Sequence, residues 1–266
     1  MKIPRPRVRL AFTLTELLVV IAIIGILAAL LLTAISQVKG RALRIQCANN
    51  VRQLGIAVQE FRTDYNSYPP FLDPTVWSEQ RYWKNALGYE MDIHSNVTFY
   101  PKGVWHCPSA YRPASNYPEN WGYDNYGYNT YGLGLNLTNS LGLSEHWIPS
   151  QPTPHVNESE VLNPSEMIAI GDGFFGGPSV IQDGAGLGRA SDNEILASLS
   201  WSTLPSDFFT ESTKRARARH QGKANVVFCD GHVESPTLQF LFADTSVAAL
   251  SVWNRDNQPH RERLVP

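Results

Sequence analysis

The sequence has little charge and no surplus of basic residues. Asp, Glu, Lys and Arg make up 17% of the 266 residues, and 22 basic side chains face 24 acidic ones, a formal net charge of -2. Four of the basic residues lie within positions 1–11, which contain no acid, so the rest of the chain has a formal charge of -6, that is -2 minus 4. Nucleic-acid binding needs an excess of Lys and Arg. We therefore do not expect the chain to bind nucleic acid.

Cysteines are also few. Cys47, Cys107 and Cys229 are too few and too scattered for a disulfide framework or a CxxC metal site. An odd number in an exported protein leaves room for one bridge and one free thiol. The spacing alone leaves the pairing open.

One long apolar run stands near the beginning of the chain. Residues 12–35 contain a single charge, Glu16, and there is no polar side chain from Leu17 to Leu32. A helix of this length spans about 36 Å, enough for a hydrocarbon core of about 30 Å. A secretory signal has a shorter apolar region with small residues after it, whereas here the small residue Ala11 precedes the run. The positive-inside rule places positions 1–11 in the cytoplasm, so the remainder is expected outside the inner membrane.

Glu16 needs an explanation, because a carboxylate within an apolar helix is costly in a bilayer. One interpretation is that the side chain lies at the interface and reaches the head groups. The other is that it pairs with a positive group of another subunit.

The stretch AFTLTELLVVIAII at residues 11–24 resembles the processing site of type IV prepilins and type II secretion pseudopilins. The resemblance implies that a membrane peptidase and methyltransferase cuts after Ala11 and methylates the new amine of Phe12. It also implies that Glu16 meets this amine on a neighbouring subunit and sets the register of assembly. Two positions depart from the family, since Gly usually precedes the cut and relatives often have Pro in place of Thr33.

Beyond Ile35 the apolar residues recur every three or four positions, which predicts a helix with one buried face. We expect one helix from about Phe12 to about Asp64, ended by the prolines at positions 69–70. Its second half is expected to pack on a globular head through a stripe formed by Val51, Leu54, Val58 and Phe61.

A second resemblance rests on the segment 47–55, on Tyr68-Pro69, on Cys107-Pro108 and on His220, which is followed by nine residues and Asp230-Gly231. These features are similar to those of a large pseudopilin-like family that ends in a His-x9-Asp-Gly motif. The resemblance extends from Ala11 to Val233, with a loosely matched middle.

The remainder predicts an α+β head with an antiparallel sheet on the long helix. Short strands are expected at 126–129, 167–170 and 224–229, and Asp230-Gly231 is a strong hairpin signal. Cys47 and Cys107 are then our candidates for a bridge between helix and head, with Cys229 as a buried thiol. We divide the chain into a basic leader (1–11), a transmembrane or filament-core helix (12–35), an amphipathic helix (36–65), the head (66–254) and a loose polar tail (255–266).

His220, Asp230 and His232, with Asp172 at the end of another strand, could form a metal or hydrolase site. We favour a structural role, in which Asp230 shapes the turn and His220 bonds a loop. No Asp-rich loop matches a calcium site. Aromatic residues between 105 and 131 could stack on sugars, although packing beneath loops is more common. The basic run 214–219 could bind anionic glycans, but a solvated loop is favoured.

Taken together, these features predict a non-enzymatic assembly subunit without a cofactor. The expected partners are the prepilin peptidase and methyltransferase, other pilin-like subunits, the inner-membrane assembly machinery and the lipid bilayer. A membrane-anchored glycan or partner adhesin and a tethered metalloenzyme are the alternatives. The first needs exposed aromatic residues at 105–131, and the second needs His220, Asp230 or His232 to converge.

Overall fold

The computed structural model describes residues 13–70, 83–91, 103–109, 126–130, 132–133, 140–144, 155–172, 219–242 and 244–263. The chain divides into two units, Met1–Ala42 and Leu43–Pro266. Ala11 and Phe12, for which processing is predicted, lie outside the described residues. So do most of the basic run and most of the glycine-rich segment at 171–188.

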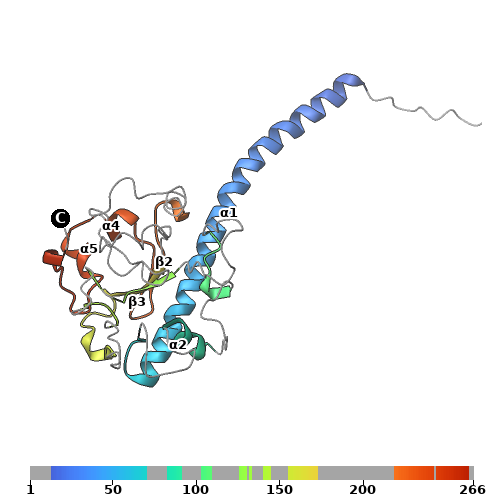
Figure 1. Ribbon diagram of the computed structural model, residues 1–266. Coiled ribbons are helices and arrows are strands. Elements are labelled where there is room, and N and C mark those ends of the chain that lie inside the picture. The colour runs from blue at the N-terminus through green and yellow to red at the C-terminus, as the bar shows by residue number, and fades with distance from the viewer. Residues whose placement is uncertain are drawn as a thin grey trace, which may run out of the picture. The chain divides into compact units, whose positions relative to one another are not determined.

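The longest element is helix α1 (Leu14–Tyr65), which matches the predicted helix to within two residues at each end (Figure 1). It begins after Thr13, whose side chain and backbone bond Glu16 as described below. It ends where Asn66 turns into the left-handed region with a φ of 53°, and where Pro69 and Pro70 prevent continuation. The helix runs without interruption through residue 33.

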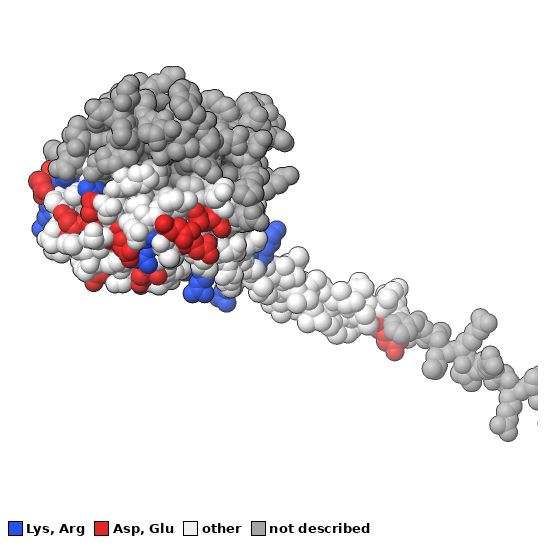
Figure 2. Space-filling model, turned by 90° about the horizontal axis from the view of Figure 1, so that it is seen from below, with Lys and Arg blue, Asp and Glu red and all other residues white. Residues whose placement is uncertain are grey.

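The first half of α1 exposes a continuous apolar surface. Side chains from Leu14 to Val38 that the structure describes are exposed, and Figure 2 shows this stretch without a basic side chain and with one acid near its start. Among the described helices, α1 alone is long and apolar enough to cross a membrane. Such a surface is unfavourable in water, because about 25 cal/mol is lost for each Å² of apolar area left exposed. It suits lipid or the apolar surfaces of other chains.

The head contains a four-stranded antiparallel sheet, which confirms the predicted α+β fold. Its strands are β1 (Tyr126–Tyr128), β2 (Ile168–Asp172), β3 (Val226–Phe228) and β4 (Val233–Glu234), in the order β1-β2-β3-β4. The hairpin between β3 and β4 forms at Asp230-Gly231, as predicted, with Gly231 at a φ of 94° that suits glycine.

The sheet separates two apolar cores, and successive residues of β3 face alternate cores. Val227 and Cys229 join the core on α1, which contains the whole predicted stripe and confirms it. Val226 and Phe228 join the second core, which packs against α4 (Leu238–Phe242) and α5 (Val247–Ser251). The sheet is thus buried on both sides, which explains its unbroken apolar strands.

A further helix, α2 (Trp83–Glu90), completes the core on the α1 side. The ring of Trp83 stacks on Tyr128 of β1 with 5.2 Å between centroids. Among the described residues, short 3-10 segments lie at Gly103–Trp105, Glu158–Glu160, Arg219–Gln221 and Arg261–Arg263.

The prediction of a loose tail after Asn254 is wrong for the residues that follow it directly. The Arg255 N–H donates to the Leu141 carbonyl at 2.8 Å, and the Arg255 carbonyl accepts from the Leu162 N–H at 2.8 Å. Its guanidinium also donates to the Gly142 carbonyl at 3.1 Å. A polar composition suggested disorder, but these bonds join the segment to two loops of the head.

Candidate functional site

Glu16 lies in the first turn of α1 and bonds back to Thr13. Its Oε2 accepts from the Thr13 backbone N–H at 2.8 Å and from the Thr13 hydroxyl at 2.7 Å, and the Thr13 Oγ1 is 3.3 Å from the Glu16 N–H. This is a capping box, in which the side chains at both ends of a Thr-x-x-Glu sequence satisfy free backbone N–H groups. The sequence analysis missed the role of Thr13, although its spacing from Glu16 carries the signal.

The capping box fixes the direction of the Glu16 carboxylate. It holds the carboxylate against the N-terminal end of α1, where the helix dipole favours negative charge. Between Glu16 and Lys39 the helix has no other charged residue. The carboxylate is therefore a single, oriented charge at one end of an apolar rod.

In the head, Cys47 of α1 and Cys107 form a disulfide with 5.0 Å between their Cα atoms. Both residues are fully buried, and the bond joins positions 60 residues apart. Cys229 is the remaining cysteine and is also buried, and burial raises the pKa of its thiol well above the usual range. A thiol that stays protonated is a poor nucleophile and a poor metal ligand.

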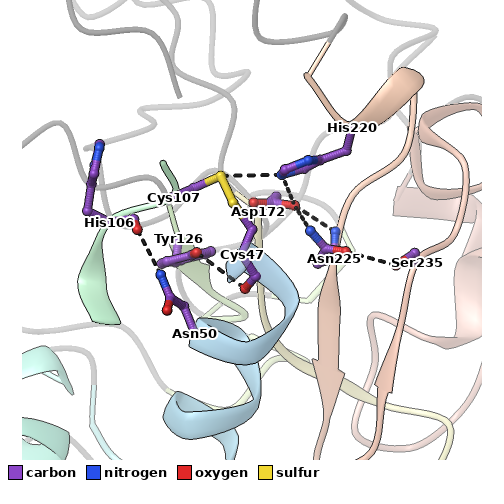
Figure 3. A network of polar contacts seen from close by, with 9 residues as sticks. All are labelled: Cys47, Asn50, His106, Cys107, Tyr126, Asp172, His220, Asn225 and Ser235. Carbon is purple, nitrogen blue, oxygen red and sulfur yellow. Dashed lines mark hydrogen bonds and ion pairs between the residues drawn. A yellow bond between two sulfur atoms is a disulfide. The ribbon is translucent and has the colours of Figure 1, made fainter. Parts of the chain in front are cut away.

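His220 lies directly against the disulfide (Figure 3). Its Nε2 is 3.3 Å from the Cys107 Sγ and 3.4 Å from the Asp172 Oδ2. The same carboxylate oxygen accepts from the Asn225 backbone N–H at 2.7 Å and from its side-chain amide at 3.1 Å. The Ser235 hydroxyl donates to the Asn225 Oδ1 at 2.8 Å. These contacts link α1, the end of β2 and the segment before β3 in one buried polar network.

Asp230 and His232 do not join this network. The Asp230 Oδ1 accepts from the His232 backbone N–H at 3.1 Å and lies 2.6 Å from the His232 Nδ1, within the hairpin turn. Among the described residues, one group of three potential ligands comes within 4.8 Å, namely Cys47, Cys107 and His220. Because the two sulfurs are bonded to each other, this group offers no thiolate to a metal ion.

The His-x9-Asp-Gly segment instead lies against α1 and the disulfide that α1 forms. His220 contacts the Cys107 sulfur of the Cys47–Cys107 bond, and the Gln59 side-chain amide donates to the Cys229 carbonyl. Between them, Val227 presses on Gly55, where an added Cβ would lie 2.4 Å from the Val227 Cγ2. The segment therefore fastens the sheet to the helix along its second half.

The described aromatic residues of the 105–131 stretch are interior. Trp105, Tyr126 and Tyr128 are buried in the core on α1 and do not form a surface for sugars. The other aromatic residues of this stretch lie outside the described residues. The described aromatic residues thus favour packing over binding.

Two families match the N-terminal part of the chain. Residues 7–32 match the family described as "Prokaryotic N-terminal methylation motif", and residues 39–72 match the family described as "Protein of unknown function (DUF1559)". No curated protein and no solved structure matches the chain. The first match covers the stretch with Glu16, and the second covers the half of α1 that carries the disulfide and the core stripe.

The motif thus lies on a helix that is long and apolar enough to cross a membrane, and this helix continues into an α+β head. A prepilin-type methylation motif, a helix able to cross a membrane and an α+β head are together the features of a type IV pilin-like protein.

Proposed function

We propose that the chain is a membrane-anchored precursor that is cut between Ala11 and Phe12, methylated at Phe12 and assembled into a filament. The filament is of the type IV pilus or type II secretion pseudopilus kind. The observation that carries this proposal is Glu16, a single oriented carboxylate at the start of an exposed apolar helix.

The membrane arrangement follows from the sequence of the helix. Residues 12–35 cross the inner membrane once, residues 1–11 remain in the cytoplasm as the leader, and the head lies on the far side. Residues 36–65 lead into the head at 66–254. The prepilin peptidase and methyltransferase and the assembly machinery of the inner membrane act on this anchored form.

Assembly follows from the same surface. When the helix leaves the lipid, its apolar side chains need a new cover, and the helices of other copies supply one. A methylated amine keeps its positive charge, so Phe12 of one copy can neutralise Glu16 of the next. This pairing sets the axial register, because the rest of the apolar rod offers no other charge.

The head has a structural role in this proposal and needs neither catalysis nor a cofactor. Its buried polar groups at positions 172, 220 and 225 bond one another or the disulfide.

The test is mass spectrometry of the membrane-extracted protein combined with the Glu16→Ala variant. We expect the native chain to begin with methylated Phe12. We expect Glu16→Ala to enter the membrane normally but to yield at least tenfold fewer filaments, because the neighbour's amine loses its partner. Gln37→Ala, a change of another exposed polar side chain of α1, is the control and should assemble normally. An intact leader in the mature protein, or full filament yield from Glu16→Ala, would contradict the proposal.

A further inference from the structure

Four side chains that can bind metal ions surround the buried disulfide of the head. Cys47 comes from α1 and Cys107 from the loop that it joins, while Asp172 ends β2 and His220 precedes β3. All four residues are buried, and Figure 3 shows them together. The two sulfurs and a ring nitrogen of His220 lie within 4.8 Å of one another. Segments far apart in the sequence thus bring together sulfur, imidazole and carboxylate, the donor types that bind zinc in proteins.

The distances between these donors match those of a tetrahedral zinc site. Zinc binds sulfur at about 2.3 Å and imidazole nitrogen or carboxylate oxygen at about 2.0–2.2 Å, so neighbouring ligand atoms lie about 3.3–3.8 Å apart. The His220 Nε2 is 3.3 Å from the Cys107 Sγ and 3.4 Å from the Asp172 Oδ2. The two sulfurs are closer because they are bonded to each other. As separate thiolates they would supply the other two ligands.

Asp172 has the surroundings of a metal-binding carboxylate. Its Oδ2 accepts two hydrogen bonds from Asn225, whose own Oδ1 accepts from the Ser235 hydroxyl. Its Oδ1 is buried and has no hydrogen-bond partner among the described residues. A buried carboxylate oxygen without a partner is costly, and a cation beside it removes that cost. Hydrogen bonds from a second layer of residues are also what orients the carboxylate ligands of metal sites.

The position of His220 is better explained by a metal ion than by the disulfide. His220 and Gln221 have positive φ angles of 56° and 59°, a region that residues other than glycine seldom adopt. The histidine ring is thereby held beside a sulfur, which is a weak hydrogen-bond acceptor, and beside a carboxylate oxygen that is distant for a hydrogen bond. Neither contact repays a strained backbone, whereas coordination of a metal ion by the ring nitrogen would.

We propose that the dithiol form of the chain binds one zinc ion through Cys47, Cys107, His220 and Asp172, and that closing the disulfide expels the ion. A newly made chain has two thiols at these positions, so zinc joins α1 to the sheet before the covalent bond does. Two thiolates and an imidazole favour zinc over calcium and magnesium, which prefer oxygen ligands. The inference goes beyond the proposed function and does not depend on filament assembly.

The two forms interconvert by a balanced reaction. Zinc binding to the dithiol form releases two protons, one from each thiol. Closing the bridge transfers two electrons from the thiolates to an oxidant, and the S–S bond replaces the two Zn–S bonds, so Zn²⁺ leaves. In the cell the oxidant is a dithiol-disulfide oxidoreductase, whose own disulfide takes up the two electrons and two protons. In the purified system diamide takes this part and is reduced to the hydrazine.

The first test measures the zinc content of the full-length chain in detergent, with Cys229→Ala in every sample to remove the third thiol. Protein reduced with a phosphine and loaded with zinc sulfate should keep about one zinc ion per chain after desalting, and the disulfide form at least tenfold less. Equal zinc in the two forms would mean an adventitious ion only. That result, or a dithiol form without zinc, overturns the proposal.

The second test assigns the ligands. His220→Ala and Asp172→Asn should each lower the zinc affinity of the dithiol form at least tenfold. The control is His232→Ala, which removes a histidine outside the network and should bind zinc as the parent does. Oxidation of each variant, followed by mapping of the Cys47–Cys107 peptide, shows that the head still folds. Unchanged zinc affinity in His220→Ala or Asp172→Asn overturns the proposal.

The third test follows the exchange itself and needs no change to a ligand. Diamide added to the zinc-loaded protein should release about one zinc ion for each disulfide formed, measured with a metal-indicator dye and by titration of the remaining thiols. A bridge that closes while zinc stays bound would place the ion elsewhere and overturn the proposal. The proposed function is tested apart from this, because methylation of Phe12 and the effect of Glu16→Ala are measured without added zinc.

Discussion

Asp172 brings a carboxylate into the interior of the head, where an unpaired charge would be costly. Its Oδ2 receives two bonds from Asn225 and faces His220, which in turn touches the disulfide. The residue types of this network were visible in the sequence, which favoured a structural role for His220 as the partner of a loop and named Asp172 as a further candidate at the end of a strand. His220 and Asp230 stand at opposite ends of the β3 segment, so the nine-residue spacing keeps them apart. The antiparallel pairing of β2 with β3 instead brings Asp172 beside His220.

Gly55 permits the closest approach between α1 and the sheet. The Cβ of Gly55→Ala would lie 2.4 Å from the Val227 Cγ2, a branched side chain in a packed strand that cannot move freely. We expect this change to lower the free energy of unfolding by about 1–3 kcal/mol, the usual cost of overpacking a core. Chemical unfolding of the detergent-extracted protein, followed by tryptophan fluorescence, measures this loss.

Gly40→Ala is the matched control for this prediction. It lies in the same helix with no described atom within 4 Å of the added Cβ, so the change should leave stability unchanged or raise it by up to about 1 kcal/mol. Equal effects of the two changes would mean that helix propensity, and not the contact with Val227, decides the outcome.

At the scale of elements, local sequence signals were sufficient to predict the long helix and the hairpin between β3 and β4. The apolar spacing predicted the buried stripe of α1, and Asp230-Gly231 predicted the turn between β3 and β4. The order of the sheet and its second core could not be predicted in the same way. They depend on contacts such as Ile168 with Phe228, which bring together residues far apart in the sequence and separated by long segments without periodicity.

The Cys47–Cys107 disulfide cross-links α1 to the head. Loop-closure entropy for 60 residues predicts that the Cys47–Cys107 bond stabilises the folded head by about 4 kcal/mol. We expect Cys47→Ser with Cys107→Ser to lose most of this amount, measured by chemical unfolding. Peptide mapping without reductant should show Cys47 joined to Cys107, and Cys229→Ala should leave that peptide unchanged. A peptide that joins Cys229 to either residue would contradict the pairing.

Over the whole molecule, the two halves of α1 have different roles. Its first half has an apolar surface with one oriented acid, and its second half is divided between a core face and an uncovered face. The disulfide, Gly55 and Gln59 all lie in the second half, where they hold the head. Membrane entry and assembly should therefore be separable by changes at different positions of the same helix.

The central part of the apolar run gives the clearest contrast. Leu27→Arg places a charge where a bilayer-spanning helix would have its middle, at a cost of about 2.5–3.5 kcal/mol on insertion scales. We expect a large fraction of this variant to be extracted from membranes by alkaline carbonate, while Leu27→Ala stays membrane-bound. Glu16→Ala should also stay membrane-bound, because it removes a charge. If Leu27→Arg remained fully in the membrane, the segment would not be crossing lipid. If Glu16→Ala were extracted, the carboxylate would act in insertion and not in assembly.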